Sequence, residues 1–197
     1  MNQERKPAAG KTPEIACGLT ITLVGMMGAG KTTIGRRLAL RLALPFFDAD
    51  REIERAAGMT VSELFRRHGE ESFRRGEAQV MARLLAGPPH VLATGGGAVL
   101  DGQTRRLIRK HALSVWLKAD LETIVRRATR RKTRPLLQNG DPRATLGRLL
   151  EERAPFYAEA DVTVESRPGP HAQTVDAIIE ALRPLLAGQA AEQTAGE

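Results

Sequence analysis

The sequence predicts an α/β fold in three layers, in which helices cover both faces of a five-stranded parallel sheet. Short apolar segments rich in β-branched residues alternate along the chain with segments of helical periodicity. Parallel strands need crossover connections, which are usually helical and right-handed, so the alternation favours a parallel sheet. At 197 residues the chain has about the length of one domain.

The first predicted unit is a strand, a loop and a helix. The strand is Leu19 to Val24, where apolar and β-branched residues alternate. A glycine-rich loop follows from Gly25 to Lys31, and Ile34, Leu38 and Leu42 then recur at the spacing of one helical face.

The next elements repeat this pattern. A short strand is predicted at Pro45 to Phe47 and a helix at Arg51 to Ala56. Thr60 and Glu63 form a capping box, in which each side chain satisfies a backbone amide at the start of the first of two helices. A strand at His90 to Thr94 follows them.

The second half of the chain continues the alternation. Its predicted elements are a helix at 103–110, a strand at 113–117, a helix from Asp120 to Ala128, a helix with Pro142 just inside its start after Asp141, a strand at 161–164 and a helix at 173–186. Ligands of such a fold bind beyond the carboxyl ends of the strands.

The predicted domain spans residues 18–187. Residues 1–17 and 188–197 are polar and without period, so they are expected to be flexible tails. No apolar run is long enough to cross a membrane, and the start shows no secretory signal, so the cytoplasm is the expected location. The single cysteine, Cys17, excludes an internal disulfide.

The charged residues favour anionic partners. Thirty basic residues against twenty-three acidic ones give a net charge of +7, and only six of the basic residues are lysines. Arginine pairs at two points with phosphate or carboxylate, which suits nucleic acid and small anionic metabolites equally. Charge alone therefore does not choose between these partners.

Residues 25–32 match the phosphate-binding motif G-x-x-x-x-G-K-[ST], between a strand and a helix as the motif requires. The glycines let backbone amides surround phosphate oxygens, and the following helix points its positive end toward them. Lys31 is predicted to reach the outer phosphates and Thr32 to ligate Mg²⁺. The predicted ATP-binding residues of this loop are Gly28, Ala29, Gly30, Lys31, Thr32 and Thr33.

Two aspartates, Asp48 and Asp50, follow the second strand. Alternate residues of an extended segment point the same way, so both carboxylates are expected to face the phosphate crevice. One would hold Mg²⁺, directly or through water, and the other, Asp50, would accept a hydrogen bond from the attacking hydroxyl. The alternative is that one of them caps the helix near Arg51.

The third strand ends in three glycines, Gly95 to Gly97, where a small ligand can lie against bare backbone. A flexible turn is the alternative. Arg74 has Glu77 three residues on and Arg153 follows Glu152, so each arginine by itself fits a surface ion pair.

A basic segment precedes the helix at Pro142. It contains Arg126, Arg127, Arg130, Arg131, Lys132 and Arg134. In a phosphoryl-transfer enzyme such a loop closes over the nucleotide and delivers a guanidinium to the γ-phosphate, so a mobile lid is predicted at about 129–141. A solvated charged face and a nucleic-acid patch are the alternatives.

Taken together, these motifs resemble shikimate kinase, a small P-loop kinase family similar in fold to nucleoside monophosphate kinases. The resemblance spans about residues 19–164. It rests on the ordered series GMMGAGKTTIGRRLA at 25–39, FFDAD at 46–50, GEESFRRGE at 69–77, TGGG at 94–97, RPLL at 134–137 and ERAPFYAEAD at 152–161.

The resemblance implies ATP as co-substrate, Mg²⁺ as cofactor and shikimate as phosphate acceptor. Lys31 and Thr32 would serve ATP and Mg²⁺, and Asp48 would help to hold the metal through water. Arg134 would be the lid arginine, and Arg127 would lie against adenine near Arg167 and Pro168. The catalytic residues implied are Lys31, Asp50 and Arg134.

The same resemblance implies how the acceptor would be bound. Arg74 and Arg153 would clamp the shikimate carboxylate, and Glu77 would orient Arg74. Asp50 would bind the substrate hydroxyls and favour attack. Gly95, Gly96 and Gly97 would complete this pocket.

The predicted reaction is transfer of the γ-phosphate of ATP to the 3-hydroxyl of shikimate, on the route to chorismate and aromatic amino acids. A monomer that binds neither nucleic acid nor membrane is expected. The nearest rival is a gluconate-type kinase, from which Arg74, Arg153 and the triple glycine separate it. A nucleic-acid binder would leave the phosphate motif unused, and a GTP switch lacks the N-K-x-D element.

Overall fold

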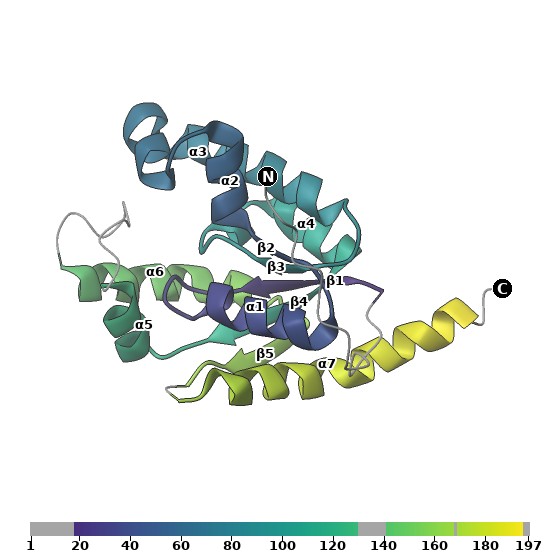
Figure 1. Cartoon of the computed structure of the whole chain (residues 1–197). Coiled ribbons are helices and arrows are strands. Elements are labelled where there is room, and N and C mark those ends of the chain that lie inside the picture. Colours follow the sequence, from purple (N-terminus) through teal and green to yellow (C-terminus); the bar gives the residue numbers. More distant parts are fainter. Residues whose placement is uncertain (1–17, 130–140, 168, 195–197) are drawn as a thin grey trace, which may run out of the picture.

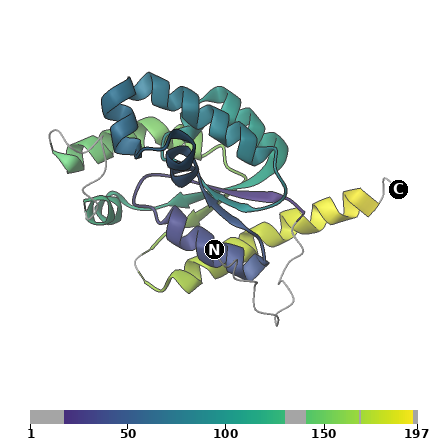
Figure 2. The ribbon, with the colours of Figure 1, turned by 45° about the horizontal axis from the view of Figure 1, so that its top comes forward.

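The fold is a five-stranded sheet between two layers of helices, as the sequence predicts (Figure 1). The computed structural model describes residues 18–129, 141–167 and 169–194. Helices α1 and α7 pack together on one face of the sheet, and α3 and α4 pack together on the other, which the rotated view separates clearly (Figure 2).

All neighbouring strands are parallel, in the order β2-β3-β1-β4-β5. The strands are β1 at Thr20–Val24, β2 at Phe46–Asp48, β3 at Val91–Ala93, β4 at Ala112–Lys118 and β5 at Val162–Glu165. Every residue of the central β1 is buried, because helices cover both of its faces.

Three helices begin directly after the cap residues that the sequence predicts, Thr60, Asp120 and Asp141. In chain order, the helices are α1 at Lys31–Leu42, α2 at Ala49–Ala57, α3 at Val61–Leu85, the short 3₁₀ helix η1 at Ala98–Leu100, α4 at Gly102–His111, α5 at Leu121–Ala128, α6 at Pro142–Tyr157 and α7 at His171–Thr194. The Thr60–Glu63 capping box is present. Asp120 accepts from the amide of Thr123, and Asp141 caps α6.

The two helices predicted before β3 are both present and follow each other without a gap as α3. Gly69, in the left-handed region at φ 76°, forms the kink between them. Helix α7 is longer than expected and runs on to Thr194, past Gly188, where the sequence predicts the start of a flexible tail. Ala187, Ala190 and Ala191 explain the extension, since alanine has the highest helix propensity.

The parallel arrangement brings the carboxyl ends of the strands to one edge of the sheet. Strand β1 leads there into the glycine-rich loop, β2 into α2, and β3 into the triple glycine. This edge is the place where the sequence analysis expects ligands. Among the helices in the described part of the chain, none is long and apolar enough to span a membrane.

Candidate active site

The glycine-rich loop between β1 and α1 adopts a conformation that depends on its glycines. Gly28 and Gly30 have φ of 88° and 104°, in the left-handed region. A Cβ on Gly28 would also lie 2.9 Å from the carbonyl oxygen of Ile124 on α5. Gly30 is the N-cap of α1, so the unpaired amides of the first helical turn lie next to the loop. This is an anion-binding geometry.

Lys31 begins α1 and lies folded over the loop. Its ammonium group donates to the carbonyl oxygens of Gly25 at 2.6 Å and Met26 at 3.0 Å. The side chain is buried, and its hydrogen bonds to these two carbonyl oxygens keep the charged ammonium group beside the phosphate loop.

Thr32 and Asp48 place two oxygen atoms that can ligate a metal ion next to each other. The Thr32 hydroxyl donates to Asp48 Oδ2 at 2.7 Å. Within the described residues no three His, Cys, Asp or Glu side chains cluster as a metal cage. Mg²⁺ usually binds one or two protein oxygens and completes its shell with water and substrate phosphates, so this pair fits such an ion.

Asp50 lies in the first turn of α2 and not, as predicted, on an extended segment. It still faces the crevice, since a Cβ on Gly95 would lie 3.1 Å from Asp50 Oδ1. Loss of hydration beside the surrounding protein, together with the negative charge of Asp48, raises the pKa of Asp50 to about 6. The positive charge of Lys31 opposes this rise. Asp50 nevertheless reaches solvent, so it can meet a ligand. Asp48 makes no side-chain cap to α2.

Arg74 and Glu77, one turn apart on α3, form a partly buried ion pair. Arg74 Nη1 donates to Glu77 Oε2 at 2.6 Å, and Nη2 donates to Glu70 at 3.1 Å. Burial raises the pKa of Glu77, against the charges of Arg74 and Arg153. Glu77 Oε1 has no hydrogen-bond partner in the described residues and lies against Gly95. The pair is therefore part of the crevice and not a surface ion pair.

Arg153 is on α6 and is only 4% exposed. Its neighbour Glu152 pairs with Arg148 instead, so the surface ion pair considered for Arg153 does not form. The Arg153 guanidinium interacts with the hydroxyl of Tyr157, one turn further along α6. Tyr157 is fully buried and donates to the carbonyl oxygen of Gly96 at 2.5 Å.

The triple glycine forms the wall between these groups. A Cβ on Gly97 would lie 2.5 to 2.6 Å from three guanidinium atoms of Arg74, and one on Gly96 would lie 3.6 Å from Arg153. A side chain at Gly97 would fill the space that the Arg74 guanidinium occupies, and one at Gly95 would fill that of Glu77 Oε1. Gly95 and Gly97 are thus needed for close approach, and the alternative of a merely flexible turn does not explain these contacts.

Arg127 on α5 contacts both the phosphate loop and the segment after β5. It donates to Ser166 Oγ at 3.1 Å and to the carbonyl oxygen of Arg167 at 3.3 Å. Its guanidinium is also 3.4 Å from the carbonyl oxygen of Ala29. The structure therefore brings Arg127, the phosphate loop and the segment after β5 together. Arg134 and most of the predicted lid lie outside the described residues.

Two buried residues of this region, Tyr157 and Ser166, have no role in the prediction from the sequence. Tyr157 lies four residues after Arg153, and this spacing, which puts both on one face of a helix, could have identified it. Ser166 directly follows β5, so its place at the carboxyl edge of the sheet was a second signal.

A phosphate-binding loop beside a crevice with two arginines and several carboxylates defines a small-molecule phosphotransferase of the P-loop kinase class. The sequence profile of the family described as shikimate kinase matches residues 27–183. The chain belongs to the shikimate kinase family.

Individual relatives agree with this assignment. The chain is 59% identical to the shikimate kinase of Bradyrhizobium diazoefficiens over 174 residues, 88% of this chain and 84% of that one. It is 54% identical to the enzyme of Rhodopseudomonas palustris, with 91% of each chain covered.

Solved structures extend the comparison. The shikimate kinase of Acinetobacter baumannii in complex with shikimate superimposes with a TM-score of 0.83 at 38% identity, over 87% of this chain and 95% of that one. A gluconokinase from Sinorhizobium meliloti, with a TM-score of 0.64 at 18% identity over 90% of this chain and 98% of that one, shares the fold alone.

Proposed function

We propose that this chain transfers the γ-phosphate of ATP to the 3-hydroxyl of shikimate, giving shikimate 3-phosphate and ADP. One observation carries the assignment of the acceptor: Arg74, Arg153 and Asp50 converge on a wall of three glycines, next to the phosphate loop. The arginines suit a carboxylate, and the aspartate suits a hydroxyl.

The acid-binding half of the site consists of the two arginines. Guanidinium groups pair with a carboxylate at two points, so Arg74 and Arg153 would hold and orient the acid group of the substrate. Glu77 and Glu70 fix Arg74 through one donor each of Nη1 and Nη2, at 2.6 and 3.1 Å, and the guanidinium has five N–H donors, so donors remain for a ligand.

The reacting half of the site is organised by Asp50. Its carboxylate would accept a hydrogen bond from the attacking hydroxyl and help to remove the proton during transfer. A pKa raised to about 6 makes Asp50 a stronger base than an ordinary aspartate, yet leaves it ionised near neutral pH.

The nucleotide site, next to these two halves of the acceptor site, is the phosphate loop with Lys31, Thr32 and Asp48. The loop amides would bind the phosphates together with Lys31. We propose Mg²⁺ as the metal, held by Thr32 and, through water, by Asp48; when bound it neutralises charge on the β- and γ-phosphates. Arg127 would contact the adenine. The lid role of Arg134 stays a prediction from the sequence.

Two rivals are less consistent with these contacts. A gluconate-type kinase shares the phosphate loop, but the paired arginines on a glycine wall are what favour a shikimate-like acid here. A nucleic-acid binder would use the basic residues and leave the buried Arg153 and the crevice without a purpose. The cytoplasmic location and the monomeric state stay predictions.

A coupled assay of ADP release tests the proposal. Purified protein is given MgATP with shikimate, quinate, gluconate or AMP at matched concentrations. We expect turnover with shikimate and none with gluconate or AMP. Turnover that depends on gluconate or AMP, or ATP binding with no turnover on any acid, would overturn the acceptor assignment.

A further inference from the structure

The glycine wall of the substrate pocket has no side chains with which to fix its own position. The turn that follows it is held locally by the amide of Ala98, which donates to the Gly95 carbonyl at 3.3 Å, and by that of Leu100, which donates to Gly97 at 3.0 Å. Both bonds lie within the loop, so they do not set its distance from the arginines. A contact from another element is needed for that.

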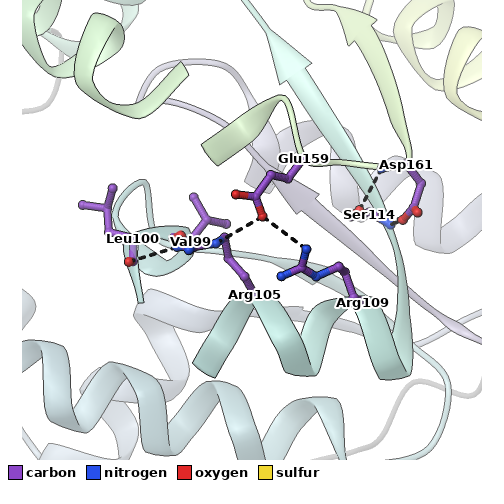
Figure 3. A network of polar contacts seen from close by, with 7 residues as sticks. All are labelled: Val99, Leu100, Arg105, Arg109, Ser114, Glu159 and Asp161. Atoms are coloured by element: carbon purple, nitrogen blue, oxygen red, sulfur yellow. Dashed lines mark hydrogen bonds and ion pairs between the residues drawn. The ribbon is translucent and has the colours of Figure 1, made fainter. Parts of the chain in front are cut away.

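Arg105 on α4 supplies such a contact (Figure 3). Its Nη1 donates to the carbonyl oxygens of Val99 at 2.7 Å and Leu100 at 3.1 Å. These two carbonyl groups lie at the end of η1. Because η1 has only three residues, they find no hydrogen-bond donor within that helix. One guanidinium thus anchors the segment that continues directly from the glycine wall.

The same guanidinium contacts Phe156 in the last turn of α6 and Glu159 just after the helix. Its Nε lies 3.2 Å from Glu159 Oε2, as an ion pair outside hydrogen-bond geometry. Its Cζ lies 4.8 Å from the ring centre of Phe156, a distance at which a cation and an aromatic ring attract. Arg153 is one turn earlier on α6. Arg105 therefore joins the glycine wall to the helix that carries a predicted substrate ligand.

A second link runs between the same two elements. The hydroxyl of Tyr157, next to Phe156, donates to the Gly96 carbonyl at 2.5 Å and interacts with Arg153. The wall and α6 are thus connected at Gly96 by Tyr157 and at the end of η1 by Arg105. Two separate links fix both the distance and the tilt of the wall relative to Arg153.

We propose that Arg105 is a positioning residue of the substrate pocket: by joining the carbonyls of η1 to Glu159 and Phe156, it sets the glycine wall against Arg153 for binding of the acid substrate. The inference rests on the proposed function. Arg105 does not touch the reacting atoms and acts through the wall.

A purely structural role for Arg105 is the competing explanation. The corner between β4 and β5 has its own links, since Asp161 Oδ2 accepts from the amide of Ser114 at 2.7 Å and from its hydroxyl at 2.6 Å (Figure 3). Asp101 separately caps α4 by accepting from the amide of Thr104. These contacts do not involve Arg105, so the fold here is held without it.

The test compares Arg105→Gln with the matched control Arg109→Gln. Arg109 is one turn away on α4 and lies 3.7 Å from the same Glu159 carboxylate, so the control removes the same charge from the same helix. Its mutation leaves the bonds from Arg105 to Val99 and Leu100 in place. Arg105→Lys restores the charge and one donor at the position.

The measurements are kcat, the KM for shikimate and for ATP, shikimate affinity by calorimetry, and Tm. For Arg105→Gln we expect the KM and Kd for shikimate to rise on the order of tenfold, the scale of losing a hydrogen bond from a charged donor. The KM for ATP stays within about twofold. Arg105→Lys recovers part of the loss, and Arg109→Gln behaves as the unmodified protein.

Two results would overturn the inference while the proposed function stands. One is an unchanged shikimate KM in folded Arg105→Gln; the other is an equal rise in both KM values. If Arg105→Gln does not fold, Glu159→Gln removes the ion pair of Arg105 and leaves its bonds to Val99 and Leu100 in place. It also removes the ion pair of Arg109, for which Arg109→Gln is the control, and an unchanged shikimate KM in Glu159→Gln has the same meaning. Absence of turnover with shikimate in the unmodified protein instead overturns the proposed function.

Discussion

Replacing Gly97 by alanine moves Arg74 without removing it. The backbone at Gly97, with φ −107° and ψ −4°, accepts alanine. The new Cβ would lie 2.5 to 2.6 Å from three atoms of the Arg74 guanidinium, whereas ordinary contacts begin at 3.4 Å. The guanidinium must therefore shift by about 1 Å, which is enough to break a two-point pairing with a carboxylate. Losing one charged hydrogen bond corresponds to about 1.5 to 3 kcal/mol, or roughly 10- to 100-fold in shikimate affinity.

Steady-state kinetics with calorimetry measures this effect. We expect the KM and Kd for shikimate to rise while the KM for ATP stays constant and Tm changes little, because the atoms that must move are the end of a flexible side chain. Gly76→Ala is the matched control: nothing lies within 4 Å of its Cβ, and alanine within α3 adds about 1 kcal/mol of helix stability. Unchanged shikimate affinity in folded Gly97→Ala would refute the assignment of Arg74 to the carboxylate.

Three further outcomes follow from the site and the core. Arg74→Ala should weaken shikimate binding by about 3 kcal/mol, since the bound carboxylate loses its partner; calorimetry measures this. Asp50→Asn should lower kcat at least about 100-fold, and in the unmodified protein kcat/KM should fall as the pH drops through about 6, where Asp50 takes up its proton. Burial lowers the pKa of His90 below its ordinary 6.5, so the unfolded chain binds a proton that the folded one does not. The unfolding free energy should therefore fall below about pH 6.5, less so in His90→Gln, as urea titrations measure.

The phosphate loop and the order of the elements could be predicted because their signals are local. A strand, a glycine motif and a helix lie within a short stretch, and the positive φ of Gly28 and Gly30 explains why the motif needs glycine. Caps such as the Thr60–Glu63 pair also depend only on near neighbours. These parts of the fold are confirmed.

The crevice depends on contacts between distant segments, and the sequence alone does not fix those. The sequence predicts Asp50 on an extended segment, but α2 begins at Ala49, so Asp50 faces the crevice from the first turn of a helix. The hydroxyl of Tyr157 meets a carbonyl 61 residues away, and Arg105 meets the end of α6. No periodicity reports such pairings, because they arise only when α6 and the glycine wall pack together.

The charges of the crevice explain why it would select an acid that carries a hydroxyl. Arg74 pairs with Glu77 and Glu70, but the Glu70 carboxylate is exposed and screened by water. Inside the crevice the guanidiniums of Arg74 and Arg153 therefore share one buried carboxylate, that of Glu77, and retain positive charge for a second one. Asp50, which also lies against Gly95 and is close to Lys31 of the phosphate loop, would repel that second carboxylate from the phosphate-loop end. An acid would therefore bind with its carboxylate toward the arginines and a hydroxyl toward Asp50. A neutral sugar would leave the excess charge unpaired, and a diacid would place a charge against Asp50, so each would bind more weakly.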